Sequence, residues 1–307
     1  MLTAFVTHPD CLLHDMGAYH PECPQRIQAI EDQLIANGLM DFLQHVEAPL
    51  VTCEQLARVH TPRYIEQIEA SSPSHGITHL DPDTAMGPHT LLAAQRAAGA
   101  VVKAVDLVME GSSPNAFCCV RPPGHHAESK KAMGFCFFNN LAVGVAHALM
   151  QHKLQRVVVV DFDVHHGNGT EEIFHDDARV LMVSTFQHPF YPYSGDQPMG
   201  TNMVNVPLPA GTRSEKWREA VQESWLPAIA SFRPEMIFIS AGFDAHLEDD
   251  MASFGLVEAD YAWVTTELRK LAEEHAQGRI VSVLEGGYEL SALSRSVVAH
   301  LRALADL

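Results

Sequence analysis

The sequence predicts an α/β domain in which a central, mostly parallel sheet carries helices on both faces. From residue 115 to the end of the chain, short apolar segments alternate with longer segments of helical periodicity. Strands separated by helices of this length imply right-handed crossovers and parallel pairing. In addition, residues 157–160 are four consecutive valines, a pattern typical of a strand that is buried on both faces of a sheet.

The first third of the chain is expected to contribute one strand and several helices. Residues 3–8 are predicted to form the strand. A helix is expected to begin near Pro24, because proline suits the first turn of a helix, and to continue to about Gly38. Two short helices are expected within residues 53–70. A long, alanine-rich helix follows over about 88–110, where small side chains would allow close packing on the sheet.

The rest of the chain is expected to alternate regularly between strands and helices. The expected strands cover residues 115–120, 156–163, 180–186, 203–208, 236–243 and 280–285. The expected helices cover residues 138–151, 168–175, 214–231, 258–276 and 289–306. No linker, repeat or low-complexity segment divides the sequence, so a single domain over residues 1–307 is expected.

Charge and composition narrow the classes of function. The formal net charge is −18, whereas a nucleic-acid-binding surface is basic, so no nucleic-acid partner is expected. The six cysteines include no Cys-x-x-Cys pair, which is typical of reduced thiols in a cytoplasmic protein. No segment approaches the roughly eighteen uninterrupted apolar residues of a membrane span, and the N-terminus lacks a secretion signal. We therefore expect a cytoplasmic protein with no membrane partner.

The segment that follows the four valines carries three ionisable residues. Asp161, Asp163 and His165 occupy alternate positions, so in an extended backbone their side chains leave the same face. Gly167 and Gly169 then end the strand. A carboxylate and an imidazole can bind one divalent metal, but a catalytic zinc site needs a third protein ligand.

The third ligand is expected to follow a second strand. Asp244 comes directly after the apolar segment 236–243, and ligands in such sheets bind at the carboxyl ends of the strands. Two carboxylates and one imidazole suit zinc or ferrous iron at a site that keeps one position open. Taken alone, the pattern of Asp163 and His165 is equally compatible with ordinary polar residues in a loop.

Two adjacent histidines, His125 and His126, follow the predicted strand 115–120. They could bind a metal, transfer protons or be exposed to solvent. Imidazole titrates near neutrality and can therefore exchange a proton with water at a metal. Asp161 and Asn168, which flank the expected ligands, are the natural hydrogen-bond partners that would orient the two rings.

Two aromatic segments are candidates for the wall of a pocket. Gly134-Phe135 and Tyr191 could belong to the core, or they could present flat surfaces to a narrow cavity. A slender apolar cavity would suit the methylene chain of a lysine or a polyamine.

The last polar segment, Gly286-Gly287-Tyr288, follows the predicted strand 280–285. Two glycines let the backbone approach a ligand closely. The phenol of Tyr288 is a neutral donor that can stabilise an oxyanion opposite a metal. The alternative is a glycine turn with a packing tyrosine.

Long, ordered motifs extend along nearly the whole chain. They are His20-Pro21-Glu22 with Arg26, Asp81-Pro82-Asp83-Thr84, Arg121-Pro122-Pro123-Gly124-His125-His126, Gly134-Phe135, Asp161-x-Asp163-x-His165-His166-Gly167-Asn168-Gly169-Thr170, Ala241-Gly242-Phe243-Asp244 and Glu285-Gly286-Gly287-Tyr288. Together they resemble the histone deacetylase and acetylpolyamine amidohydrolase superfamily of zinc hydrolases. The resemblance implies a single-domain arginase–deacetylase α/β fold.

The same resemblance implies a role for each site residue. Zinc would be held by Asp163, His165 and Asp244. His126 would be the general base for the attacking water and then the acid for the departing amine, with His125 as its electrostatic companion.

Further roles follow from the resemblance. Asp161 would orient His125 and Asn168 would orient His126, and Arg26 would lie behind the metal near an inner acetate channel. A structural potassium ion would lie against Asp161, Asp163, His165 and Ser184, largely through backbone oxygens. The substrate would contact Gly134, Phe135, Tyr191, Gly286, Gly287 and Met251.

Two residues refine the expected activity. Asn168 is typical of class II-like members, and Tyr288, in place of the histidine of weakly active relatives, indicates a competent deacylase. We therefore expect a zinc-dependent amidohydrolase, with ferrous iron as an alternative metal, that removes acetyl or other short acyl groups from lysine side chains.

Three alternatives remain open. The substrate could be an acetylated polyamine. Relatives that prefer polyamines usually present an acidic residue to the distant ammonium group, whereas the residue expected at this position, Met251, is apolar and favours acyl-lysine. Its neighbours Glu248, Asp249 and Asp250 are acidic. The protein could also bind acyl-lysine without catalysis, whereas arginase-type chemistry would need ligands for two metals. The oligomeric state stays open, and the short segment between Gly76 and Thr90 is compatible with a monomer or with an assembly that differs from that of the polyamine-type relatives.

Overall fold

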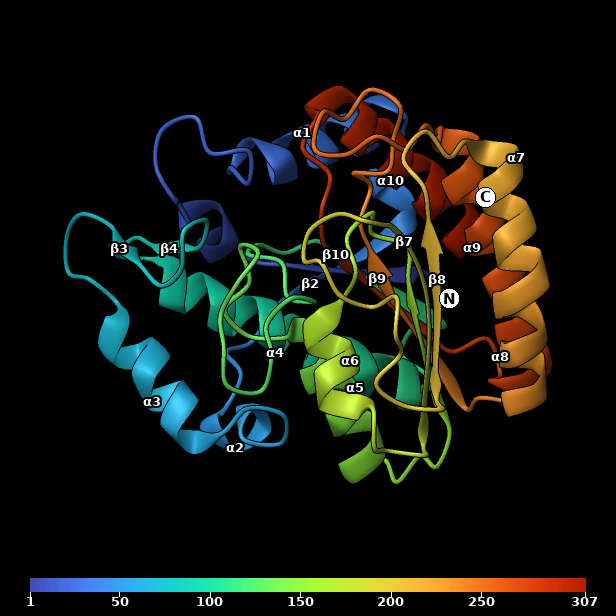
Figure 1. Cartoon of the computed structure of the whole chain (residues 1–307), viewed down its shortest axis with the longest axis horizontal. Coiled ribbons are helices and arrows are strands. Elements are labelled where there is room, and N and C mark those ends of the chain that lie inside the picture. The colour runs from blue at the N-terminus through green and yellow to red at the C-terminus, as the bar shows by residue number, and fades with distance from the viewer.

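One eight-stranded sheet organises the molecule. The computed structural model describes residues 1–307, and the strands follow the order β2-β1-β5-β10-β9-β6-β7-β8 (Figure 1). Every neighbouring pair is parallel, which confirms the predicted α/β fold. The strands are β1 (Thr3–Thr7), β2 (Leu43–Glu47), β5 (Asn115–Cys118), β6 (Val157–Asp161), β7 (Val180–Gln187), β8 (Met203–Leu208), β9 (Met236–Ala241) and β10 (Ile280–Leu284).

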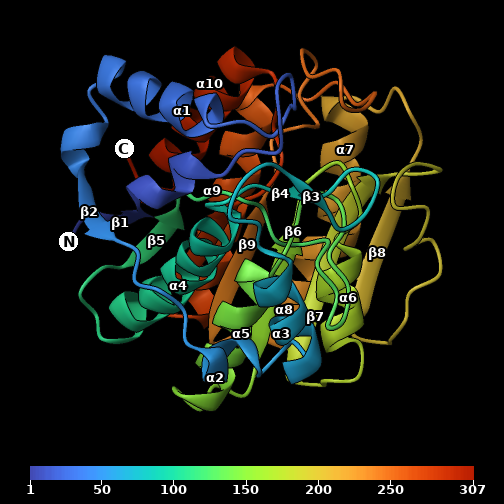
Figure 2. The same cartoon turned by 90° about the vertical axis from the view of Figure 1, so that its left-hand side faces the viewer.

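Helices cover both faces of this sheet (Figures 1 and 2). α4, α5 and α6 form one layer, and α1, α10, α9 and α8 form the other, where α10 packs between α1 and α9. The helices are α1 (Gln25–Ala36), α2 (Cys53–Leu56), α3 (Pro62–Ser71), α4 (Thr90–Met109), α5 (Asn140–Met150), α6 (Asn168–Phe174), α7 (Ser214–Ala220), α8 (Leu226–Phe232), α9 (Glu258–His275) and α10 (Leu290–Ala305). None of them is long and apolar enough to cross a membrane.

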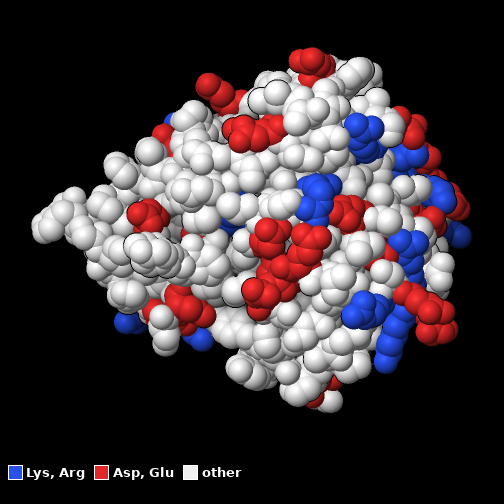
Figure 3. Space-filling model, turned by 90° about the horizontal axis from the view of Figure 1, so that it is seen from above, with Lys and Arg blue, Asp and Glu red and all other residues white.

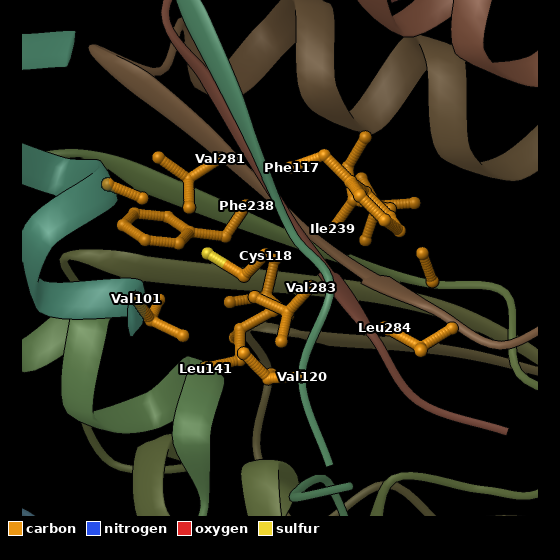
Figure 4. Close-up of a cluster of buried hydrophobic side chains, with 14 of the residues drawn as sticks. Val101, Phe117, Cys118, Val120, Leu141, Phe238, Ile239, Val281, Val283 and Leu284 are labelled. Atoms are coloured by element: carbon orange, nitrogen blue, oxygen red, sulfur yellow. The ribbon is translucent and has the colours of Figure 1, made fainter. Parts of the chain in front are cut away.

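One part of the core lies between the sheet and the layer of α4 and α5. Figure 4 shows side chains of β5, β9 and β10 packed with Val101 of α4 and Leu141 of α5. A Cβ atom at Gly144 of α5 would lie 2.3 Å from a methyl carbon of Val101, so the glycine permits the close approach of the two helices. Phe238 is fully buried in this cluster, and truncating such a residue to alanine costs about 3–5 kcal/mol.

Two short pairings were not predicted. β2 adds a parallel edge strand in which Leu43 pairs with Thr3, but only Leu43 of this strand is buried. A strand that buries one side chain produces almost no hydrophobic pattern. A two-residue antiparallel pair, β3 (Thr78–His79) and β4 (Ala85–Met86), lies in the segment between α3 and α4.

The helix predicted over residues 214–231 is wrong in one detail, because a π-helical segment, Val221–Trp225, separates α7 from α8. Pro227 lies in the first turn of α8. Proline has no N–H to give to the carbonyl four residues earlier, so the regular ladder cannot continue through this point.

A buried histidine links α9, α10 and β10. Nδ1 of His300 lies 2.6 Å from the hydroxyl of Thr265, which itself donates to the carbonyl of Tyr261. The proton of the ring is therefore on Nδ1, and the hydroxyl of Ser282 donates to Nε2 at 2.9 Å. Burial lowers the pKa of His300 to about 3, so this ring is neutral and fully hydrogen-bonded.

The strand order sets the position of the polar clusters. β5, β10, β9 and β6 are consecutive neighbours in the sheet, and each is followed by one of the motifs found in the sequence. The carboxyl ends of parallel strands lie at one edge of the sheet, where ligands of such folds bind. Four loops from distant parts of the chain therefore meet at this edge.

Candidate active site

The structure brings Asp163, His165 and Asp244 together. Nδ1 of His165 lies 3.1 Å from Oδ1 of Asp163 and 3.0 Å from Oδ2 of Asp244. One ligand atom from each of the three residues lies within 4.8 Å of the other two. Asp163 and Asp244 are buried, and His165 is only 7% exposed.

The backbone reaches this geometry through turns rather than through an extended strand. β6 ends at Asp161, and the carboxylate of Asp161 accepts a hydrogen bond from the N–H of Asp163. The carboxylate of Asp163 likewise accepts from the N–H of His165. The strand predicted over residues 156–163 is therefore too long, because these local hydrogen bonds compete with the sheet.

The arrangement of Asp163, His165 and Asp244 requires a proton or a metal cation between the side chains. Burial alone would lower the pKa of His165, but the hydrogen bonds to Asp163 and Asp244 raise that pKa to about 10. Burial and the charge of Asp163 raise the pKa of Asp244 to about 7. Nδ1 of His165 faces only carboxylate oxygens, so a proton or a metal must lie between them. Two carboxylates and one imidazole, with positions left for water and substrate, fit zinc or ferrous iron.

A second group of three candidate ligands lies far from this edge. His147 and His152 each place Nε2 at 2.8 Å from Oδ1 of Asp106. However, Arg58 donates to Nδ1 of His147 at 2.9 Å, which leaves the proton of that ring on Nε2. A protonated nitrogen cannot bind a metal, so this group is a hydrogen-bonded cluster.

The two adjacent histidines have different partners and opposite charge preferences. Nδ1 of His125 lies 3.0 Å from the carboxylate of Asp161, and Nδ1 of His126 lies 2.8 Å from Oδ1 of Asn168. Burial would lower the pKa of His125, but the carboxylates of Asp163 and Asp161 raise it well above its usual value. Burial and the rings of His125 and His165 hold the pKa of His126 well below its usual value. The structure thus favours a charged His125 beside a neutral His126.

Glu285 fixes the backbone of the histidine pair. Its carboxylate accepts from the N–H groups of Gly124 and His125 and from the hydroxyl of Ser240. Glu285 is fully buried, and burial raises its pKa to about 7. The side chain thereby connects the loop after β5 with β9 and β10.

A narrow pocket opens onto the cluster. It encloses about 140 Å³ and is lined by Asp83, His126, Gly134, Phe135, His165, Phe190, Tyr191, Met251 and Tyr288. Four of the predicted substrate contacts, Gly134, Phe135, Tyr191 and Met251, are among these residues. Phe190, which was not predicted, stacks on His165 with ring centroids 5.6 Å apart.

Gly286 and Gly287 lie beneath the pocket and do not line it. The N–H of Gly286 donates to Oδ2 of Asp163 at 2.9 Å. The carbonyl of Gly287 accepts from Nε of Arg26 at 2.6 Å. These two glycines therefore support the metal ligands and the Tyr288 loop, whereas contact with the substrate was expected from the resemblance.

Two buried charged residues hold the backbone next to Tyr288. The guanidinium of Arg26 lies 5.0 Å from the centre of the phenol ring and also binds Glu22. The carboxylate of Asp249 accepts from the N–H groups of Tyr288 and Glu289. Burial raises the pKa of Tyr288 well above its usual value, although Arg26 opposes the shift. The phenol is therefore a neutral donor in the wall of the pocket.

The predicted potassium ligands also lie close together. Asp161 and Ser184 are paired across β6 and β7. No hydrogen bond reaches the carbonyl oxygens of the buried residues Asp163 and His165. Buried carbonyl groups in folded proteins normally have a partner, so these two are free to bind a cation.

Glu285 lies within one of the sequence motifs and Asp249 lies outside them, but the role of neither could be predicted, because each depends on contacts with N–H groups of distant segments. Phe190 could have been found as the aromatic neighbour of Tyr191. Asp83 was quoted within a motif but was not assigned to the pocket.

Comparisons with known proteins agree with this geometry. Residues 20–304 match the histone deacetylase domain family. A histone deacetylase-like amidohydrolase of Pseudomonas aeruginosa is 37% identical over 310 residues, which cover 93% of this chain and 81% of the relative. The polyamine deacetylase HDAC10 of Mus musculus is 36% identical over 331 residues, which cover 99% of this chain and 48% of the relative.

The fold comparison gives the same answer. The crystal structure of the HDA15 HD domain matches with a TM-score of 0.94 and 33% sequence identity, covering 99% of this chain and 88% of that chain. The resemblance and the fold predicted from the sequence motifs are therefore confirmed. The chain belongs to the histone deacetylase family of hydrolases.

Proposed function

We propose that this protein is a zinc-dependent deacetylase that hydrolyses the amide of acetylated, or otherwise short-acylated, lysine side chains. One observation carries the proposal. One pocket is lined by a candidate metal ligand, His165, by a neutral imidazole, His126, and by a neutral phenol, Tyr288. These are the groups that metal-assisted amide hydrolysis requires.

Asp163, His165 and Asp244 would hold the metal, and a bound zinc ion would polarise the acyl carbonyl and lower the pKa of water. His126 would take the proton of the attacking water. Its Nδ1 is bound to Asn168, so Nε2 is the basic atom. As the C–N bond breaks, His126 would return this proton to the departing amine, which yields a carboxylic acid and a free amine.

Tyr288 and His125 would stabilise charge. The hydroxyl of Tyr288 would donate to the carbonyl oxygen as that oxygen becomes negative, and loss of one such donor commonly costs about a hundredfold to a thousandfold in rate. His125, which is held charged by Asp161, would add a fixed positive charge beside the reacting atoms.

The lining of the pocket supports an apolar substrate stem. Phe135, Phe190, Tyr191 and Met251 provide apolar walls, which suit the four methylenes of lysine. Asp83 lies at the same pocket with a partly exposed carboxylate, which could accept N–H groups from a peptide backbone.

An acetylated polyamine is a second candidate substrate. One relative is named as a polyamine deacetylase, and the exposed acidic residues Glu248 and Asp250 lie just before Met251 in the chain. Figure 3 shows acidic side chains gathered near the middle of one face, which would attract a cationic chain. Met251 itself is apolar, and for this reason we favour acyl-lysine.

A structural potassium ion is part of the proposal. The free carbonyl oxygens of Asp163 and His165 support it, together with the nearby Asp161 and Ser184. Potassium is a hard cation that binds oxygen ligands, so it would complement a carbonyl cage next to the zinc ligands.

The proposal is tested by an acyl-substrate panel run with metal-depleted and zinc-restored protein. The panel should include an acetyl-lysine peptide, longer acyl-lysine peptides and acetylputrescine. We expect zinc-dependent turnover that is fastest on an acyl-lysine peptide. Faster turnover of acetylputrescine would favour the polyamine function, and substrate binding without turnover would indicate a non-catalytic acyl-lysine-binding protein.

A further inference from the structure

The side-chain amide of Asn168 lies between two groups with different requirements. Its Oδ1 lies 2.8 Å from Nδ1 of His126, and its Nδ2 lies 2.8 Å from Oε1 of Glu128. The other contacts of Nδ2, to the carbonyl of His126 and the sulfur of Met133, are both 3.4 Å long. Glu128 is thus the strong partner of the amide nitrogen.

The chemistry of Glu128 decides which way the amide faces. An ionised carboxylate only accepts hydrogen bonds, so the NH₂ group of Asn168 must point to Glu128 and the oxygen must point to His126. His126 must then carry its proton on Nδ1 and keep the lone pair of Nε2 free. Without this constraint the amide can turn by 180° and present NH₂ to His126. That orientation would move the ring proton to Nε2 and remove the base.

Glu128 is itself held in place. Nε2 of His60 accepts from the N–H of Asn139, so Nδ1 of His60 carries a proton and donates to the carbonyl of Glu128 at 3.1 Å. The N–H of Glu128 donates to the carbonyl of Lys131. Two backbone anchors therefore fix the start of the Glu128 side chain.

We propose that Glu128 is a positioning residue that sets the tautomer of His126 through Asn168. This inference rests on the proposed function of His126 as the general base. The chain Glu128–Asn168–His126 is continuous, with both bonds at 2.8 Å. Asn168 was predicted to orient His126, and the carboxylate of Glu128 in turn orients Asn168.

The test uses substitutions at both ends of the Glu128–Asn168 bond, each measured for kcat and KM on an acetyl-lysine peptide with zinc-loaded protein. Glu128→Leu removes the acceptor and should lower kcat by about thirtyfold, within the range that general-base catalysis supplies, with KM little changed. Glu128→Gln keeps an acceptor oxygen and should lose less than about fivefold by the same reasoning.

The decisive comparison is made in the Asn168→Asp background. In that background the carboxylate of Glu128 would face the new carboxylate at position 168. Their repulsion should disturb the hydrogen bond from residue 168 to His126 and lower kcat by at least about tenfold. Adding Glu128→Gln provides an amide donor for the new carboxylate and restores the net charge. Glu128→Gln should therefore lower kcat in the wild-type background, where residue 168 is asparagine. In the Asn168→Asp background, the same substitution should raise kcat.

A loop control separates positioning from folding. The carboxylate of Glu172 holds Ser129, the next residue of the same loop, through the N–H and the hydroxyl, and it accepts no hydrogen bond from the side-chain amide of Asn168. Glu172→Leu should change kcat by less than about twofold. The proposal is overturned if Glu172→Leu and Glu128→Leu lower kcat equally, if Glu128→Leu keeps wild-type kcat, or if Glu128→Gln has the same effect in both backgrounds. Absence of turnover in the wild-type protein would instead refute the proposed function.

Discussion

Replacing Gly286 by alanine should displace two of the three proposed zinc ligands. An added Cβ would lie 2.2 Å from Oδ2 of Asp244 and 2.6 Å from Oδ2 of Asp163, whereas ordinary contact begins at 3.4 Å. Each carboxylate must therefore retreat by about 1 Å, and zinc–oxygen bonds are only about 2.0–2.2 Å long. The φ angle of Gly286 is not in the left-handed region, so the effect would come from crowding alone.

The expected result is loss of both metal and turnover. Misplacement of reacting groups by about 1 Å costs roughly a hundredfold in rate, and we expect kcat/KM on an acetyl-lysine peptide to fall by at least that factor. Zinc content after dialysis against a weak chelator should fall below one equivalent. Gly255→Ala is the matched control, because the nearest atom to its new Cβ, at 3.2 Å, belongs to the flexible side chain of Arg213.

Displacement of the ligands would be excluded if Gly286→Ala bound zinc as tightly as the wild type and kept kcat/KM within about twofold, a change too small for ligand displacement. A fall in turnover with unchanged zinc would also contradict it, because the effect would then lie at the Tyr288 loop, which the same glycines support. Equal losses in Gly255→Ala would point to general destabilisation.

Three further predictions concern Tyr288, Asp249 and His300. Tyr288→Phe should keep one zinc per chain but lower kcat by about a hundredfold to a thousandfold, and near-normal steady-state turnover would defeat the role of the phenol. Asp249→Ala should lower kcat together with thermal stability, because the N–H groups of Met251, Tyr288 and Glu289 lose their acceptor; unchanged kcat would show that the Tyr288 loop holds its position without it. In the folded chain, burial lowers the pKa of His300 to about 3. Below pH 6.5 the imidazole of His300 therefore binds a proton in the unfolded chain but not in the folded chain. Stability therefore falls as the pH falls, and from pH 7 to pH 5 the wild type should lose about 2 kcal/mol more unfolding free energy than His300→Leu; equal losses in urea titrations would contradict this.

The grouping of Asp163, His165 and Asp244 could be predicted from the sequence because these residues follow buried strands. Four valines and the apolar segment before Asp244 identify two inner strands, and parallel pairing then brings their carboxyl ends together. Asp163, His165 and Asp244 could thus be grouped before their distances were known. The exact course of the backbone after Asp161 could not be predicted, since it depends on hydrogen bonds from carboxylates to nearby N–H groups.

Residues that act through a single tertiary contact are much harder to predict. In the sequence, Glu128 and Asp249 look like ordinary surface acids. Their roles depend on Asn168 in the first case and on the N–H groups of Tyr288 and Glu289 in the second, which belong to distant segments. β2 was missed for a similar reason, because it is defined by pairing with β1 and not by its own pattern. The π-helical segment before α8 could have been anticipated from Pro227, which interrupts the helical hydrogen bonds.

A zinc titration of metal-depleted protein, followed by turnover of an acetyl-lysine peptide, tests directly whether each chain holds one catalytic cation. One catalytic cation held by Asp163, His165 and Asp244 predicts that activity rises linearly with added zinc and reaches a plateau at one equivalent per chain. Activity that persists without metal, or that needs two equivalents, would exclude a single catalytic cation at these three residues.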